Sequence, residues 1–223
     1  MLTNHFAQTL GIDCDDSEMM YPIVTVTHCQ NPSLFYCRFE SDKKRFLQLA
    51  GLIQQQIEDF PNSMPGLKND LKESVSLLCF SIIQKQWCRG RLIAIKFDPK
   101  SKTTCAKVFL IDFGSVEFVL WKSSSVRNSN DEIDNFNGGK GFCFPCSLYN
   151  VKPIDEQNQS NSDWTSYANY LFKKKTDQNC FSLKVMKNQN NIIVCDLLAH
   201  NFPINQFCLS NFLVKSYVAL YIN

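Results

Sequence analysis

The chain has 223 residues, 44% of them hydrophobic, and its 23 basic and 21 acidic residues leave a formal net charge of +2. This composition provides enough apolar residues for a sizeable core. The near balance of charge gives no reason to expect nucleic acid as the main partner, and no apolar run approaches the ~20 residues that span a bilayer. The N-terminal residues also lack the basic and apolar regions of a signal peptide.

The cysteines number eleven, and most of them lie inside apolar runs. A free cysteine in such a run behaves as a small buried hydrophobe, so the pattern indicates a reducing compartment rather than a disulfide framework. Cys143 and Cys146 have CxxC spacing, but no second pair or nearby histidine completes four zinc ligands. The segment also does not lead from a strand into a helix, as a redox CxxC does. We therefore expect no metal and no cofactor.

The first third of the chain predicts a hairpin followed by a helix. Residues 1–20 are polar and acidic, and we interpret them as a leader arm. The β-branched stretch 22–28 and the aromatic stretch 34–39 flank a turn, which is typical of a β-hairpin. Between residues 42 and 60, apolar side chains recur at three- and four-residue spacing and predict an amphipathic helix that ends at Pro61.

The middle of the chain is dense in short strands separated by turn residues. The predicted strands span 75–83, 87–97, 105–111 and 116–121. Strands at such short and regular spacing favour a small β-barrel. The polar stretch 128–141, which contains Gly138 and Gly139, predicts a long loop.

The last third predicts a helix, a hairpin and a mixed C-terminal segment. Ser162 and Asp163 can cap a helix that runs through Phe172, and Lys173–Lys175 would lie at its C-terminus, where cations favour the helix dipole. The hairpin strands are expected at 180–186 and 192–197. Residues 202–223 predict a short helix and a strand.

Asp112, Phe113 and Gly114 form an Asp-Phe-Gly triplet, which occurs in the metal site of protein kinases and also suits a tight turn. A kinase needs a glycine-rich loop and an HRD motif upstream, but the glycines that precede the triplet are isolated from one another and no HRD is present. HExxH, GxSxG and P-loop motifs are also missing. We therefore predict a hairpin turn in which Asp112 bonds backbone amides two residues on and Gly114 supplies a positive φ, and we expect no catalytic residue.

The strands around this turn resemble the Tudor family. The stretch VFLIDFGSVE at 108–117 is similar to the family signature V-F-x-I-D-Y-G-N-x-E, and residues 79–90 are similar to its C-x-A-x-F…W-Y-R-A/G element. Residues 146–153 resemble the C-x-L-x-x-V-x-P element that follows the barrel in extended Tudor domains. The first hairpin, the long helix, Trp164 and the late hairpin resemble their flanking module, so the resemblance covers about residues 20–220.

The resemblance implies a mainly β fold with a few helices, in which a Tudor SH3-like β-barrel is inserted in a staphylococcal-nuclease-like, OB-type domain. The implied parts are a leader arm, the first part of the nuclease-like domain with a linker helix, the Tudor barrel, and the second part of the nuclease-like domain. They span residues 1–20, 21–73, 74–137 and 138–223.

The resemblance also implies a role. Extended Tudor domains bind peptide tails that contain arginine, commonly symmetrically dimethylated. Many belong to germline scaffolds of the cytoplasm and of perinuclear germ granules (nuage), where they recruit Piwi-clade Argonautes for piRNA biogenesis. The implied partner is such an N-terminal Argonaute tail, without a membrane, a cofactor or catalysis.

The family surrounds the arginine with four aromatic side chains and an asparagine, because a flat cation is attracted to aromatic faces by ~0.5–2 kcal/mol each. The resemblance assigns the aromatic positions here to Ile82 or Ile83, Cys88, Leu110 and Phe113, and the asparagine position to Ser115. Only Phe113 is still aromatic, so the cage is incomplete. Trp87, Asp112 and Glu117 are the expected supporting residues. Strand alternation predicts that Phe109 points away from the face of Leu110.

Three hypotheses follow. In the first, the domain binds an Argonaute tail without requiring dimethylation, and Asp112 and Glu117 contribute to the grip. In the second, it is a structural or dimerising module that binds no peptide. In the third, single-stranded RNA binds the OB-like part, which the near-neutral charge disfavours.

Overall fold

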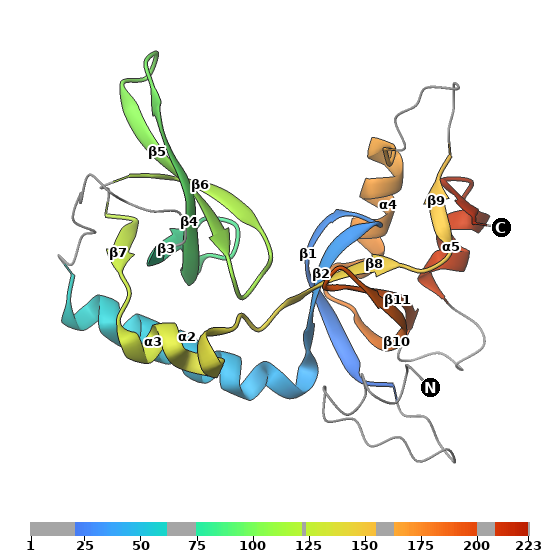
Figure 1. The fold of residues 1–223 in the computed structure, drawn as a ribbon, viewed down its shortest axis with the longest axis horizontal. Helices are drawn as coiled ribbons and strands as arrows, with labels where there is room; N and C mark the ends of the chain where they lie inside the picture. The colour runs from blue at the N-terminus through green and yellow to red at the C-terminus, as the bar shows by residue number, and fades with distance from the viewer. Residues whose placement is uncertain (1–20, 62–74, 122–123, 155–162, 200–207, 223) are drawn as a thin grey trace. The chain divides into compact units, whose positions relative to one another are not determined.

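A computed structural model describes residues 21–61, 75–121, 124–154, 163–199 and 208–222 (Figure 1). The fold is mainly β with a few helices, as expected. The chain forms two compact units. The outer unit holds the described residues up to Glu40 and from Phe144 onward, and the inserted unit holds Ser41–Cys143. The expected leader arm lies outside the described residues.

The outer unit is built on a closed five-stranded barrel in the order β1-β10-β11-β8-β2. Its pairs are antiparallel except for β11 and β8, which run parallel. Two shorter strands, β9 and β12, pair beside it, and two helices, α4 and α5, complete the unit. The bounds are β1 Ile23–Asn31, β2 Leu34–Phe39, β8 Phe144–Leu148, β9 Val151–Pro153, α4 Ser166–Thr176, β10 Cys180–Gln189, β11 Ile192–Ala199, α5 Leu209–Lys215 and β12 Ala219–Tyr221.

Both hairpins of this unit are confirmed, and so are the short C-terminal helix and strand. The start of helix α4 was placed too early, because several polar residues precede it and each could act as a cap. Thr165 is the N-cap, and its side chain accepts a hydrogen bond from the amide of Ala168 at 3.1 Å. The three lysines from Lys173 to Lys175 do lie in the last turn of the helix.

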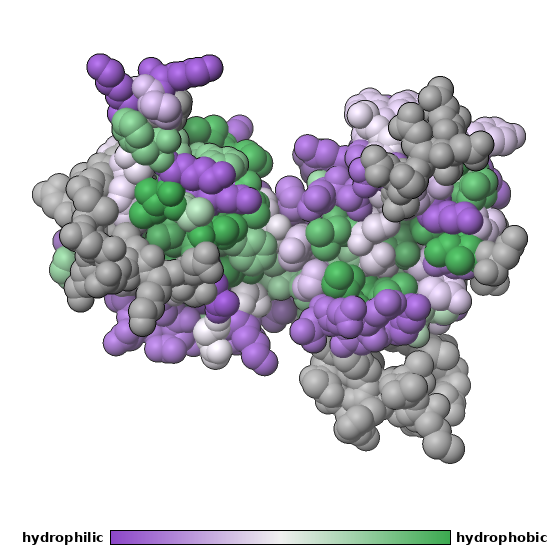
Figure 2. All heavy atoms as spheres, turned by 45° about the horizontal axis from the view of Figure 1, so that its top comes forward, coloured by the Kyte–Doolittle hydropathy of each residue, from purple (hydrophilic) through white to green (hydrophobic). Residues whose placement is uncertain are grey.

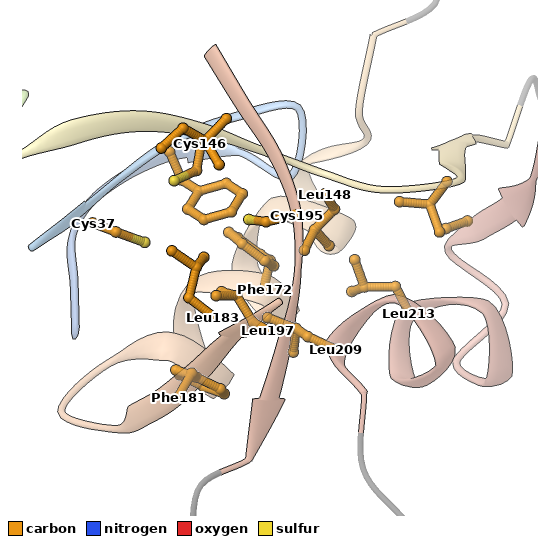
Figure 3. Packing of buried hydrophobic residues seen from close by; sticks show 14 of the residues in the cluster. Cys37, Cys146, Leu148, Phe172, Phe181, Leu183, Cys195, Leu197, Leu209 and Leu213 are labelled. Atoms are coloured by element: carbon orange, nitrogen blue, oxygen red, sulfur yellow. The ribbon is translucent and has the colours of Figure 1, made fainter. Parts of the chain in front are cut away.

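Three cysteines point into the core of the outer barrel (Figure 3). Cys37, Cys146 and Cys195 are fully buried free thiols, and they pack in one cluster with Phe172 and Leu183. Burial raises the pKa of Cys37 and Cys146 above its ordinary value, since a thiolate would lose its hydration there. These cysteines are small core residues, as expected. Cys180 differs from them, since it is exposed at the start of β10.

The inserted unit contains a five-stranded sheet in the order β6-β5-β4-β3-β7. Its first four strands lie within about two residues of the predicted bounds at most ends. The short β7 was missed, because three residues are too few to show an alternating pattern. The bounds are β3 Ser76–Ser81, β4 Gln86–Asp98, β5 Thr103–Leu110, β6 Val116–Leu120 and β7 Val126–Asn128.

Helix α2, Lys43–Asp59, follows the one-turn η1, Glu40–Asp42, and packs on the sheet through its apolar face. Leu49 and Ile53 form a buried cluster with Leu78 of β3 and with Ile133 and Phe142. The helix therefore belongs to the same compact unit as the five-stranded sheet, whereas the predicted division had placed it with residues 21–73.

The polar stretch 128–141 was predicted to be a long loop, and this prediction was wrong. It contains α3, Asp131–Asn135, and the 3-10 turn η2, Phe136–Gly139. Asn130 caps α3 by accepting a hydrogen bond from the amide of Ile133 at 2.8 Å. The segment is too short and too polar to show a helical period, so its helix depends on this cap and on the burial of Ile133. In the described parts of the chain, no helix is long and apolar enough to cross a membrane.

Candidate functional site

The turn between β5 and β6 is closed by backbone hydrogen bonds. The amides of Phe113 and Gly114 donate to the carbonyl of Leu110 at 3.1 and 2.8 Å, and the amide of Leu110 donates to the carbonyl of Ser115 at 2.8 Å. Gly114 has a φ of 81°, which a residue with a Cβ adopts only with strain. The predicted turn and its positive φ are therefore confirmed.

The prediction that Asp112 bonds the backbone amides of its own turn was wrong. Its carboxylate forms a bidentate ion pair with the guanidinium of Arg89. Oδ1 lies 2.6 Å from Nη2, and Oδ2 lies 3.0 Å from Nε. Oδ1 also accepts from the amide of Phe142 at 3.1 Å. A charge-assisted pair of this geometry is stronger than neutral bonds to nearby amides, and it takes the carboxylate away from the turn. Both side chains are 2% exposed, so the charge of Asp112 is balanced inside the fold.

Arg89 uses all of its donors. Besides Asp112, its Nη1 donates to the carbonyls of Ile133 and Phe136, both at 3.0 Å, and Nη2 donates to the carbonyl of Lys140 at 3.1 Å. One guanidinium thereby ties the strand β4, the β5–β6 turn and the α3–η2 segment together. This network fixes the backbone on which Phe113 is displayed.

The side chains at the predicted cage positions fall into two groups. Cys88, Leu110 and Phe113 are 2%, 0% and 7% exposed and belong to one hydrophobic cluster in the inserted unit. Ile82 and Ile83 lie in the β3–β4 turn and are 82% and 72% exposed. In this arrangement the two isoleucines do not close over the other three positions.

A small pocket lies within the inserted unit, between helix α2 and the five-stranded sheet with its β5–β6 turn. It is lined by Phe46, Leu49, Ala50, Ile53, Gln86, Trp87, Cys88, Asp112 and Phe113. The space inside it is about 10 Å³, room for about one water molecule. The ring of Phe46 meets Phe113 edge to face with centroids 5.6 Å apart. The pocket thus combines two predicted cage positions, Cys88 and Phe113, and two expected supporting residues, Trp87 and Asp112, with one face of helix α2.

Sequence reasoning missed the contribution of helix α2 to this pocket. The apolar spacing that contains Phe46, Leu49, Ala50 and Ile53 was visible, but it gave no sign that this face lies against the barrel turn. The expected orientation of Phe109 is consistent with burial, since Phe109 is half-buried whereas its neighbour Leu110 is fully buried.

Two buried polar side chains of the inserted unit, Glu117 and Ser115, differ in their hydrogen bonds. The carboxylate of Glu117, 9% exposed, accepts a hydrogen bond from Ser81 Oγ at 2.6 Å. Ser115 is 3% exposed, and its Oγ has no hydrogen-bond partner among the described residues. A buried hydroxyl without a partner costs about 1–3 kcal/mol, so a donor brought by a ligand would satisfy it.

The thiol of Cys88 adds no charge to the pocket. Burial raises its pKa strongly, and the nearby Cys79, Glu117 and Asp112 raise it further. At neutral pH this position is therefore an uncharged, weakly polar wall.

The family model described as Tudor domain matches residues 16–150, more than half of the chain. The chain therefore belongs to the Tudor domain family. Human RING finger protein 17 is 25% identical over 82% of this chain, which spans only 13% of the length of that relative.

Among solved structures, the extended Tudor domain TD3 of mouse TDRD1, in complex with a MILI peptide containing dimethylarginine, matches with a TM-score of 0.69 at 20% identity. The match covers 95% of this chain and 97% of that one. A mutant extended Tudor domain of Drosophila melanogaster Papi, in complex with an unmethylated Piwi N-terminal peptide, matches with a TM-score of 0.71 at 12% identity, covering 90% and 99% of the two chains. The inserted unit and the outer barrel thus form an extended Tudor fold.

Proposed function

We propose that this chain is a non-catalytic module that binds the arginine-containing N-terminal tail of a Piwi-clade Argonaute and does not require the arginine to be dimethylated. The proposal extends to this chain what its structural neighbours are seen to bind, including the unmethylated Piwi peptide held by Papi. It also assigns the chain to a cytoplasmic germ-granule scaffold of the piRNA pathway, on family resemblance alone.

The observation that carries the proposal is the character of the residues at the cage positions. Cys88 and Leu110 are buried and non-aromatic, and the isoleucines of the β3–β4 turn are solvent-exposed. Each missing aromatic face removes ~0.5–2 kcal/mol of attraction for a methylated guanidinium. A dimethylated arginine would therefore gain little here over an unmethylated one.

The size of the pocket supports the same conclusion. Its interior of about 10 Å³ must open before any guanidinium can enter, and two extra methyl groups would demand more room. An unmethylated guanidinium keeps all five of its donors, and the buried Ser115 Oγ lacks a donor. The proposed complex places this guanidinium near Phe113 and Phe46, which line the pocket.

Titration calorimetry tests the proposal with three peptides that share one Piwi-type tail sequence. They carry an unmethylated arginine, a symmetrically dimethylated arginine, or alanine at the central position. We expect the two arginine peptides to bind within threefold of each other and the alanine peptide to bind more weakly. A tenfold preference for the dimethylated peptide would contradict the proposal. The absence of binding at millimolar concentration would favour a structural or dimerising module instead.

The matched variants are Phe113→Leu and Phe109→Leu. The first removes the aromatic wall of the pocket but keeps an apolar side chain, and the second alters a half-buried ring on the other face of the same sheet. Loss of one cation–π contact predicts a roughly 2–30-fold weaker affinity for Phe113→Leu. Equal loss for both variants would place the binding site elsewhere.

A further inference from the structure

The strand β6 carries apolar side chains on its outward face. Val116, Phe118 and Leu120 alternate with the buried Glu117 and Val119, and they are 42%, 65% and 53% exposed. A strand with one face on the core is ordinarily polar on the other face, so three consecutive outward apolar residues are unusual.

The neighbouring strands extend this surface in register. Phe109 and Cys105 of β5 lie beside Val116 and Leu120, and Lys107 lies beside Phe118. One strand further, Arg91 and Lys96 of β4 pair with Phe109 and Cys105, and Ala94 pairs with Lys107. The outward face, here called the β4–β6 face, is therefore apolar along β6 and basic along β4.

Three cations lie on this face. Arg91 and Lys96 come from β4 and Lys107 comes from β5, and the only acidic residue of β6, Glu117, is buried on the other face. Among the described residues, none of these three cations forms an ion pair with a carboxylate. Figure 2 shows apolar and hydrophilic surface side by side on the inserted unit.

The placement of the cations decides how a partner would lie. β6 ends the sheet order, and neighbouring strands are about 4.8 Å apart, so β4 lies about 10 Å from β6. A strand added at the outer edge of β6 would lie about 14 Å from β4, beyond the reach of Arg91 and Lys96. A helix is about 10 Å wide and, laid over the face, covers β6 with one side and β4 with the other.

The spacing along β6 also suits a helix. From Val116 to Leu120 the strand rises about 14 Å, at about 3.4 Å per residue. Three apolar residues at i, i+4 and i+8 of a helix span about 12 Å. We propose that the β4–β6 face docks a short acidic amphipathic helix of a partner protein, with its apolar stripe on Phe118 and its acidic flank on Arg91, Lys96 and Lys107. This surface lies on the opposite side of the sheet from the side chains that form the pocket cluster.

Fluorescence anisotropy of a labelled 14-residue helical peptide tests the proposal. The peptide carries leucines at positions 2, 6, 9 and 13, a glutamate after each leucine, and alanine or glutamine elsewhere. A companion peptide has lysine in place of every glutamate. We expect saturable micromolar binding of the acidic peptide to the full chain, weakened by salt, and at least tenfold weaker binding of the basic peptide.

Two pairs of variants locate the site. Phe118→Ser should weaken binding at least fivefold, whereas Phe97→Ser, which alters an equally exposed ring of opposite strand alternation, should leave it unchanged. Lys107→Glu should weaken binding of the acidic peptide and strengthen that of the basic one, whereas Lys100→Glu in the β4–β5 turn should do neither. Phe113→Leu should have no effect, which separates this proposal from the proposed arginine pocket.

Four outcomes would overturn the proposal. One is binding that fails to saturate below millimolar concentration, and another is equal weakening by Phe118→Ser and Phe97→Ser. A dimer in sedimentation velocity that Phe118→Ser dissociates would assign the face to a second copy of this chain. A labelled 14-nucleotide RNA of random sequence that binds this face more tightly than the acidic peptide would assign it to nucleic acid.

Discussion

Replacing Arg89 by methionine removes the cation that holds the β5–β6 turn. The side chain is 2% exposed and bonds Asp112 and the carbonyls of Ile133, Phe136 and Lys140. Methionine fills much of the same volume, but it leaves a buried carboxylate without its counter-ion and three carbonyls without a donor. The change therefore tests whether the network, rather than packing alone, holds the inserted unit together.

The expected loss is large. Breaking a buried ion pair by removing one partner costs about 3–5 kcal/mol. The inserted unit has roughly 100 residues, so this corresponds to a fall of more than about 12 °C in its unfolding midpoint. Arg91→Met is the matched control, because Arg91 lies two residues further along the same strand and is exposed. Its effect should stay within about 0.5 kcal/mol.

Hydrogen exchange measured by mass spectrometry separates the two units. In Arg89→Met, the slowest amides of β4 and β5 should exchange about 100-fold faster or more, and those of β10 and β11 should be unchanged. The double variant with Asp112→Leu should lose less free energy of unfolding than the sum of the two single variants. The reason is that it removes the buried carboxylate that Arg89→Met leaves without a counter-ion. If Arg89→Met exchanged within threefold of Arg91→Met, the reasoning about this network would be refuted.

Three further predictions concern stability. Gly141→Ala should destabilise by at least about 1–3 kcal/mol in urea, because a Cβ there would lie 1.8 Å from the Ile111 carbonyl oxygen, whereas Gly51→Ala in open space on α2 should stabilise by about 0.5–1 kcal/mol. Burial raises the pKa of Cys79 from 9.0 to about 12. The protonated thiol therefore contributes its full share to the free energy of unfolding below pH 9, and this share is lost as the pH rises toward 12. Urea unfolding at pH 10 should show about 1.4 kcal/mol of this loss, and Cys79→Ala should remove that share of the pH dependence. Thr165→Ala should cost about 0.5–2 kcal/mol through the lost cap, seen as faster amide exchange at the start of α4.

The strands were predictable because their signal is local. Alternation of apolar and polar residues and the punctuating turn residues lie within each segment, and tertiary contacts reinforce them. The long helix was equally clear from its spacing. Helix α3 and strand β7 are too short to carry such a signal, and they form only because the surrounding unit holds Ile133 and Val126 in its core.

The candidate site was predicted at the level of residue identity but not of geometry. The resemblance assigns Cys88 and Leu110 to aromatic positions of the family, and this assignment stays a prediction. It did not show that Gln56 is buried and donates to the carbonyl of Asn128 at 2.8 Å. It also gave no sign that Phe46 packs against Phe113, since the two are far apart in the chain.

The sequence by itself determined the family and the mainly β architecture, because these depend on residue order and spacing. The tertiary structure alone decided what Asp112 does. From its position in the turn it could bond nearby amides, but folding brings Arg89 within 2.6 Å, and a buried charge is most stable beside an opposite charge. Partner choice among distant side chains depends on three-dimensional proximity, which local sequence does not encode.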